Sequence, residues 1–250
     1  MVAISTRSQT RSAWGLLYAW SAVALMWAFW ISFVIFLASP RRLASVWPLP
    51  MVDRGGFFDT SGWLAALIDL GLITLFGLQH SLMARPWFKA AVMASLPPAF
   101  VRCTYVHLAN VALFALILLW QPIPIELWTI GAGVLKDLLW MAFAVGWIIL
   151  FLGAWSFGIA DLLGLTQMQA WVQGRQDYRQ RLRTGRLYRW LRHPMYVGVL
   201  LGVWATPRMS LGHALLALGL TGYVLIAMRY EERDLLANYG ARYQAWRTAR

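Results

Sequence analysis

The sequence predicts an all-α polytopic integral membrane protein with about five to six transmembrane segments, ending in a helical hairpin and a C-terminal interfacial helix. Hydrophobic residues make up 60% of the 250 positions, above the roughly 45–50% found in soluble proteins. Charged residues make up 13%, about half the usual share. A water-soluble domain could not cover so much apolar surface with so few charges, and a disordered chain would be far more polar. We expect one domain over residues 1–250, with the lipid bilayer as its partner.

Residues 14–157 are expected to form four transmembrane helices. The first apolar run, 14–38, covers roughly 37 Å at about 1.5 Å per residue, which is enough to cross a bilayer with some tilt. The run is longer than the apolar core of a signal peptide, so we expect a retained helix. The next three runs, 62–82, 103–120 and 134–157, are separated by proline-containing loops, and 86–101 is expected to hold a short surface helix.

Residues 158–250 are expected to form a polar loop, a hairpin and a tail. The arginine-rich stretch 158–193 precedes an apolar block, 196–228, that is too long for one span and is split at 205–208. The first hairpin limb is short, and it spans the membrane only if helix continues back through 187–191 across a kink at Pro194. From Arg229 onward, apolar residues recur at three- and four-residue steps, which predicts an interfacial amphipathic helix interrupted by Gly240.

The distribution of positive charge predicts the orientation in the membrane. Lysine and arginine total 22 against 10 acidic residues. Most of these cations lie in the N-terminus, in loops 83–102 and 158–195, and in the C-terminal tail. These four segments lie on the same side of the membrane if the chain crosses it six times. The other side keeps Arg41, Arg42, Arg54, Lys136 and Arg208. The positive-inside rule then places both termini and the 158–195 loop in the cytoplasm, with a bacterial inner membrane as the expected location.

Several classes of site are not supported by the sequence. Cys103 is the one cysteine, which excludes a disulfide framework and a multi-cysteine zinc site. The four histidines are scattered, and we find no HExxH, P-loop or strand-associated GxGxxG motif. We therefore expect no metal, no nucleic-acid partner and no soluble Rossmann-type domain.

Polar residues inside the expected spans have both structural and functional interpretations. Asp69, His107 and Asn110 are expected to make interhelical hydrogen bonds, with a protonated carboxyl as the alternative for Asp69. Gln79 and His80 lie at the cytoplasmic end of the second span, where His80 is either a satisfied interfacial residue or a functional one.

A second group of polar residues lies at the cytoplasmic ends of the hairpin, which its antiparallel limbs bring together. It consists of Arg192, His193, Pro194, Tyr196, Gly198, Glu231 and Glu232. An exposed ion-pair girdle would explain these charges. The break at Pro194 and the paired acids favour a ligand pocket, because broken helix ends in membranes usually line a cavity. Gly198 and Gly202 also form a GxxxG step, which is typical of close helix packing.

The motif Arg192-His193-Pro194-x-Tyr196-x-Gly198, followed by Glu231-Glu232, resembles the isoprenylcysteine carboxyl methyltransferase and phospholipid methyltransferase superfamily. Residues 76–86 and 204–207 are similar to its methanethiol S-methyltransferase and NnrU-like branch. The resemblance covers roughly residue 62 to the end. It implies a single methyltransferase domain that binds S-adenosylmethionine, without a metal, where the hairpin meets the cytosol.

The same resemblance implies roles for individual residues. Residues Arg192, His193, Pro194, Tyr196 and Gly198 would form one wall of the cofactor site, and Glu231 and Glu232 the other. Asp161 and Gln167 match the exit of the fourth helix in the methanethiol branch, although 158–160 reads Gly-Ile-Ala where that branch has Asn-His-Phe. We expect His80, or secondly Asp161, to act as the base, and Gln79 and Gln167 to contact the substrate.

The resulting hypothesis is S-adenosylmethionine-dependent methylation of a small thiol, with methanethiol to dimethyl sulfide as the preferred reaction. Two alternatives stay open. One is a methyltransferase for an isoprenylcysteine or a lipid. The other is a non-enzymatic NnrU-like accessory membrane protein.

Overall fold

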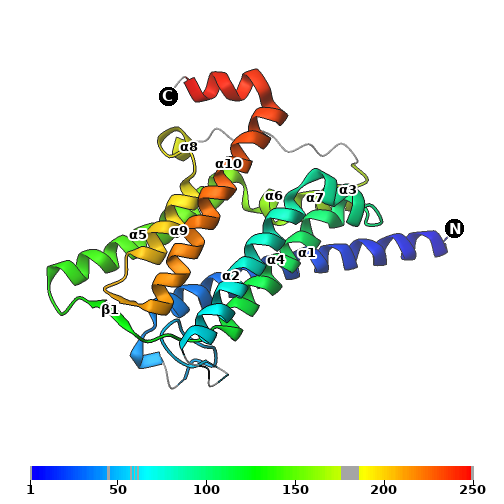
Figure 1. The fold of residues 1–250 in the computed structure, drawn as a ribbon. Coiled ribbons are helices and arrows are strands. Elements are labelled where there is room, and N and C mark those ends of the chain that lie inside the picture. Colours follow the sequence, from blue (N-terminus) through cyan, green and yellow to red (C-terminus); the bar gives the residue numbers. More distant parts are fainter. Residues whose placement is uncertain are drawn as a thin grey trace.

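The structure is a computed structural model that describes residues 2–43, 46–56, 58, 60, 62–175 and 186–248 (Figure 1). Within these residues, five helices are long and apolar enough to cross a membrane. They are α1 (Val2–Ala38), α2 (Gly62–Ala84), α4 (Pro98–Leu119), α5 (Val134–Phe157) and α10 (Leu211–Thr248). The all-α polytopic membrane fold predicted from composition is thereby confirmed.

The long helices and the short α9 (Pro194–Trp204) pack as a closed bundle in the order α5, α9, α10, α2, α4, α1. Aromatic contacts close it between α1 and α5, where the Trp30 and Trp147 rings lie 5.6 Å apart and those of Trp27 and Phe151 lie 5.3 Å apart. Buried aromatic and aliphatic side chains from both ends of the sequence share one core. The N-terminal helix is therefore part of the same packed unit as the hairpin.

Polar side chains inside the spans pair with neighbouring helices or their ends, as expected. The Asp69 carboxylate is fully buried and accepts a 2.8 Å hydrogen bond from the Gln121 backbone N–H just after α4. On the other face of α4, Asn110 Nδ2 donates to the Ala22 carbonyl of α1 at 3.4 Å, and His107 lies within hydrogen-bonding distance of the Tyr18 carbonyl.

The contact between α5 and α9 depends on glycine. A Cβ atom on Gly146 would lie 2.7 Å from the Gly202 nitrogen and 2.9 Å from the Gly198 oxygen. Real Cβ atoms do not approach backbone this closely, so the two helices can touch only where side chains are absent. The GxxxG step of α9 is therefore used for helix packing.

The first limb of the hairpin differs from the expectation. Helix α8 (Arg186–Trp190) ends before residues 191–193, which are not helical, and His193 has φ −127° and ψ 66°. Pro194 begins α9 instead of kinking a longer helix, because its fixed φ and missing N–H suit the first helical position. Residues 187–190 are helical in α8, but the break at 191–193 means that the continuous helix required for a spanning first limb is not formed. Helix α9 alone, at about 16 Å, is about half as long as the hydrocarbon core is thick.

The second limb is longer than expected. Helix α10 continues through Arg229, where we expected the tail to begin, and breaks only at Gly240, which has φ 45° and ψ −123°. Figure 1 shows the red tail turning away after this break. Because residues 229–239 offer no glycine or proline, nothing ends the helix earlier. Glu231 and Glu232 therefore lie on the same helix that crosses the membrane.

Short elements complete the fold. Strand β1 (Glu126–Thr129) pairs antiparallel with β2 (Arg208–Ser210) and joins the α4–α5 loop to the turn of the hairpin, which the sequence analysis did not anticipate. The expected surface helix is α3 (Pro86–Val92), and η1 (Arg41–Leu43) follows α1. The polar stretch after α5 contains α6 (Ile159–Leu163) and α7 (Leu165–Val172), while its arginines between 176 and 185 lie outside the described residues.

Candidate active site

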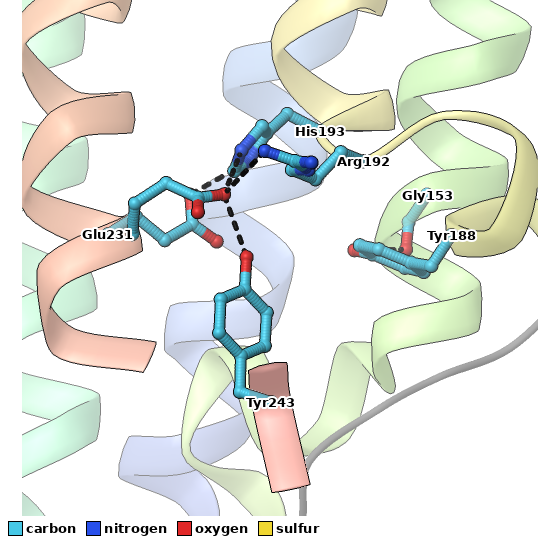
Figure 2. A network of polar contacts seen from close by, with 7 residues as sticks. Gly153, Tyr188, Arg192, His193, Glu231 and Tyr243 are labelled. Carbon is cyan, nitrogen blue, oxygen red and sulfur yellow. Dashed lines mark hydrogen bonds and ion pairs between the residues drawn. The ribbon is translucent and has the colours of Figure 1, made fainter. Parts of the chain in front are cut away.

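The hairpin limbs bring His193 between the two glutamates of α10 (Figure 2). His193 Nε2 lies 2.9 Å from Glu232 Oε1, and His193 Nδ1 lies 3.5 Å from Glu231 Oε2. His193 precedes α9, and each glutamate lies on α10, so the cluster ties the two limbs together at their ends. Antiparallel limbs were expected to produce this arrangement.

The two glutamates have different surroundings. Glu232 Oε1 accepts a 2.8 Å hydrogen bond from the Tyr243 hydroxyl, which reaches back from the tail, and lies 3.8 Å from Arg192 Nη1. Its side chain is 22% exposed, whereas that of Glu231 is 36% exposed. Glu232 is thus held from three directions, and Glu231 keeps more of its surface accessible.

The charge state of His193 follows from this cluster. Burial alone would lower its pKa, but the carboxylates of Glu231 and Glu232 outweigh burial and raise the pKa of His193 above its ordinary value. A protonated ring neutralises part of the charge of two adjacent acids, which lets them stay close together.

Three other residues of the predicted cofactor site lie along α9. The Tyr196 ring stacks on His193, with the ring centroids 5.6 Å apart, and its hydroxyl lies near the Glu231 side chain. Pro194 is buried against Gly153 of α5. A Cβ on Gly198 would lie 2.6 Å from the Gly146 oxygen, so Gly198 is needed for helix packing, and its place in the cofactor wall stays a prediction.

His80 lies in a cluster of aromatic rings formed by α2, α4 and α10. Its Nε2 shares a 2.7 Å hydrogen bond with the Tyr105 hydroxyl, and its ring centroid lies 5.0 Å from that of Tyr105. The rings of Phe76 and Tyr223 lie 5.3 and 6.2 Å from it. His80 Nδ1 is buried and has no hydrogen-bond partner among the described residues.

Tyr223 connects this ring cluster to the hairpin. Its ring lies 6.2 Å from that of His80, and its hydroxyl lies near the Ser81 and Glu231 side chains. Tyr196 in turn lies within electrostatic range of the Tyr105 and Tyr223 hydroxyls. His80 is therefore linked to the polar cluster of the hairpin through Tyr223.

Gln79 lies next to this region on α2. Its Nε2 contacts Met83 Sδ at 3.0 Å, and its buried Oε1 has no hydrogen-bond partner among the described residues. Beyond it, Arg85 forms a 3.1 Å ion pair with Asp234 that fastens the end of α2 to α10.

Asp161 and Gln167 lie on α6 and α7. Gln167 Nε2 donates to the Asp161 carbonyl at 3.2 Å, and Gln167 Oε1 is buried with no hydrogen-bond partner in the described part of the chain. Arg102 of α4 links this segment to the ring cluster: its Nε donates to the Leu162 carbonyl at 2.7 Å, and its guanidinium lies 5.1 Å from the centroid of the Tyr105 ring. Helix α6, which carries Asp161, is thus linked to the ring cluster around His80 through Arg102 and Tyr105 of α4.

The sequence analysis did not single out Tyr105, Tyr223, Arg102 or Tyr243. A tyrosine or arginine inside a largely apolar helix requires a polar partner for its hydroxyl or guanidinium, which marks such positions as candidates. Tyr105 and Tyr223 are polar residues in largely apolar helices and could have been chosen on that ground. The sequence does not indicate which distant residue each hydroxyl contacts.

Comparison with known proteins shows which family the chain resembles. Residues 141–242, from α5 to the tail, match the family model described as phospholipid methyltransferase. Methanethiol S-methyltransferase 2 of Bradyrhizobium diazoefficiens is 43% identical over 186 residues, covering 73% of this chain and 70% of the relative. Methanethiol S-methyltransferase of Mycobacterium tuberculosis is 38% identical over 183 residues, covering 73% and 75%.

A protein with a different name also matches. Nurim of Sus scrofa is 32% identical over 217 residues, covering 78% of this chain and 81% of the relative. No solved structure matches the chain. The coverage and identity of these relatives show that the chain belongs to the methanethiol S-methyltransferase family of membrane methyltransferases.

Proposed function

We propose that the chain transfers a methyl group from S-adenosylmethionine to a small thiol, with methanethiol as the preferred acceptor and dimethyl sulfide as the product. The observation that carries this proposal is the buried Nδ1 of His80, which has no hydrogen-bond partner among the described residues and lies in a cluster of aromatic rings that Tyr223 links to the charged hairpin cluster. The relatives named methanethiol S-methyltransferase support the choice of acceptor. We further propose that residues 1–250 act as one domain, since α1 closes the bundle against α5.

The charged cluster fits the amino-acid end of S-adenosylmethionine. When bound, this cofactor supplies an electrophilic methyl group on a sulfonium sulfur. Glu231 would accept hydrogen bonds from the ammonium group, and Arg192, which is 41% exposed, would pair with the carboxylate. Both side chains reach solvent, so they can meet a ligand without opening the core. His193 and Glu232 would hold them in place.

His80 would act on the thiol. An alkanethiol titrates at or above the ~8.5 of free cysteine, so a base that takes its proton increases the fraction of reactive sulfur. The rings of Phe76, Tyr105 and Tyr223 exclude water around that position and provide favourable contacts for a sulfur atom. Gln79 and Gln167, each with a buried free carbonyl oxygen, would contact the bound substrate, and Asp161 is the second candidate for the base.

The purified protein in lipid nanodiscs tests this function directly. With labelled S-adenosylmethionine and methanethiol, we expect dimethyl sulfide in the headspace and labelled methyl groups in that product. Methylation of a farnesylated cysteine or a phospholipid in place of methanethiol would refute the small-thiol acceptor. Cofactor binding without transfer to any acceptor would favour an accessory role.

We also propose that the site faces the cytoplasm of a bacterial inner membrane. Cys103 is fully buried, so an introduced cysteine provides the accessible thiol. An impermeant reagent added to intact cells should leave Gln173→Cys, which follows α7, unlabelled, while it labels Thr129→Cys on exposed β1 at the opposite end of the bundle (Figure 1). The reverse pattern would overturn the orientation.

A further inference from the structure

His80 is engaged through one ring nitrogen only. Its Nε2 is bound to Tyr105 at 2.7 Å, while Nδ1 is buried and unpartnered among the described residues. We propose, building on the proposed function, that Tyr105 is a positioning residue: its hydroxyl holds His80 in the tautomer that presents Nδ1 to the thiol.

The tautomer follows from the chemistry of a neutral imidazole, in which one nitrogen carries the hydrogen and the other is basic. If Nδ1 is to accept a proton, Nε2 must carry the hydrogen and donate it to the Tyr105 oxygen. The Tyr105 hydroxyl can accept or donate, and its 2.7 Å bond fixes the ring orientation. A hydrogen on Nδ1 would be a buried donor without a partner among the described residues, so the pair is more stable when Nε2 donates and the hydroxyl accepts. Without the hydroxyl, the ring could place its hydrogen on either nitrogen, and part of the population would lack a base at Nδ1.

Tyr105 is itself firmly held. It is 7% exposed, and its ring contacts both the His80 ring and the guanidinium of Arg102. Because Arg102 Nε also donates to the Leu162 carbonyl, Tyr105 is fixed relative to α6 as well as to its own helix. A hydroxyl held in this way can orient a histidine without large motion.

The step that Tyr105 assists is proton transfer from the thiol. The S–H bond breaks, its electron pair stays on the thiol sulfur, and the proton goes to Nδ1 of His80. The sulfur then forms its new bond to the methyl carbon, whose former bonding pair returns to the sulfonium sulfur. Tyr105 touches none of the reacting atoms and acts through His80.

Tyr105→Phe removes the hydroxyl and keeps the ring. We expect kcat for thiol methylation to fall roughly 10- to 100-fold, within the range that a general base supplies, with cofactor affinity unchanged within about twofold. In a His80→Ala background, the same substitution should cause no further loss, because residues that act as a unit are not additive.

Tyr18→Phe is the matched control. Its hydroxyl is hydrogen-bonded to Thr104 Oγ1 at 3.0 Å, one residue before Tyr105, and its ring contacts His107 at 4.5 Å. This substitution removes an equivalent interhelical hydrogen bond beside a histidine outside the site. We expect it to retain the wild-type kcat, so that a shared loss in both variants would indicate a general packing effect and contradict the proposal.

Nitrogen-15 NMR of histidine-labelled protein provides a readout that does not depend on turnover. The His80 signals, assigned by their loss in His80→Gln, should show a protonated Nε2 and a bare Nδ1, and Tyr105→Phe should produce a mixture of tautomers. A protonated Nδ1 in the wild type, or an active Tyr105→Phe enzyme with the wild-type kcat, would overturn the inference. A wild type with the expected tautomer but no thiol methylation would refute the proposed function and leave the positioning role intact.

Discussion

Glu231→Gln is expected to lower the affinity for S-adenosylmethionine by about 30-fold or more. Removing one partner of a hydrogen-bonded charge pair costs about 2 kcal/mol or more, and each 1.4 kcal/mol corresponds to about tenfold in affinity. Glutamine keeps the shape of the side chain, and the 2.9 Å contact between His193 and Glu232 remains. Isothermal titration calorimetry on detergent-solubilised protein measures the effect.

Two variants on the same helix distinguish a ligand contact from a general loss of charge. Asp234→Asn removes an acid that is paired with Arg85, and we expect it to leave cofactor affinity nearly unchanged. Glu232→Gln should lower the thermal midpoint as well as the affinity, since Glu232 binds His193 and Tyr243. An unchanged affinity in Glu231→Gln would remove Glu231 from the cofactor site.

Gly146→Ala should destabilise the protein by about 1–3 kcal/mol, the usual cost of overpacking. The added methyl would meet the backbone of α9 at Gly198 and Gly202 at under 3 Å. Backbone cannot rotate away as a flexible side chain can, so the helices must separate. Because α9 carries His193 at its start, cofactor affinity should fall together with stability.

Gly71→Ala is the matched control for this substitution. Gly71 lies in α2, and a Cβ there would have no atom within 4 Å. Alanine is favoured over glycine in a helix by up to about 1 kcal/mol, so this variant should melt at or above the wild-type temperature in a thermal-shift assay. A melting temperature for Gly146→Ala equal to that of Gly71→Ala would show that the α5–α9 contact is not the tight one described.

The spans were predictable because hydrophobicity and proline act locally. The run 134–157 is α5 to the residue, and Gly240 is the break in the tail. The expectation that the tail begins at Arg229 was wrong, because the high density of charge after this residue suggested a separate surface segment. A helix ends at residues that cannot continue it, and the first such residue after Arg229 is Gly240. The ribbon between β1 and β2 joins segments about 80 residues apart, and no local pattern encodes that pairing.

The site was partly predictable for a similar reason. The hairpin alone places His193 near the glutamates, and a motif suffices to find them. The partnership of His80 with Tyr105 arises from the packing of α2 against α4, which neither sequence spacing nor motif reveals. Gly198 fits two interpretations in sequence, a cofactor wall and a helix contact, and only the distance to Gly146 shows that it makes the helix contact.

Because α10 is unbroken from Leu211 to Glu231, its length determines how far the acidic residues lie from the other end of the bundle. From Leu211, beside the β ribbon, to Glu231 the helix rises about 30 Å, which equals the usual thickness of the hydrocarbon core. A helix of this length would bring the acids to the boundary between hydrocarbon and water, a depth that the proposed charged cofactor and the proposed apolar thiol could each reach from their own phase. Adding or deleting one residue of α10 before Glu231 would move Glu231 along the helix axis by about 1.5 Å and rotate it about that axis by about 100°. Length changes in this family should therefore accumulate in loops and spare this helix.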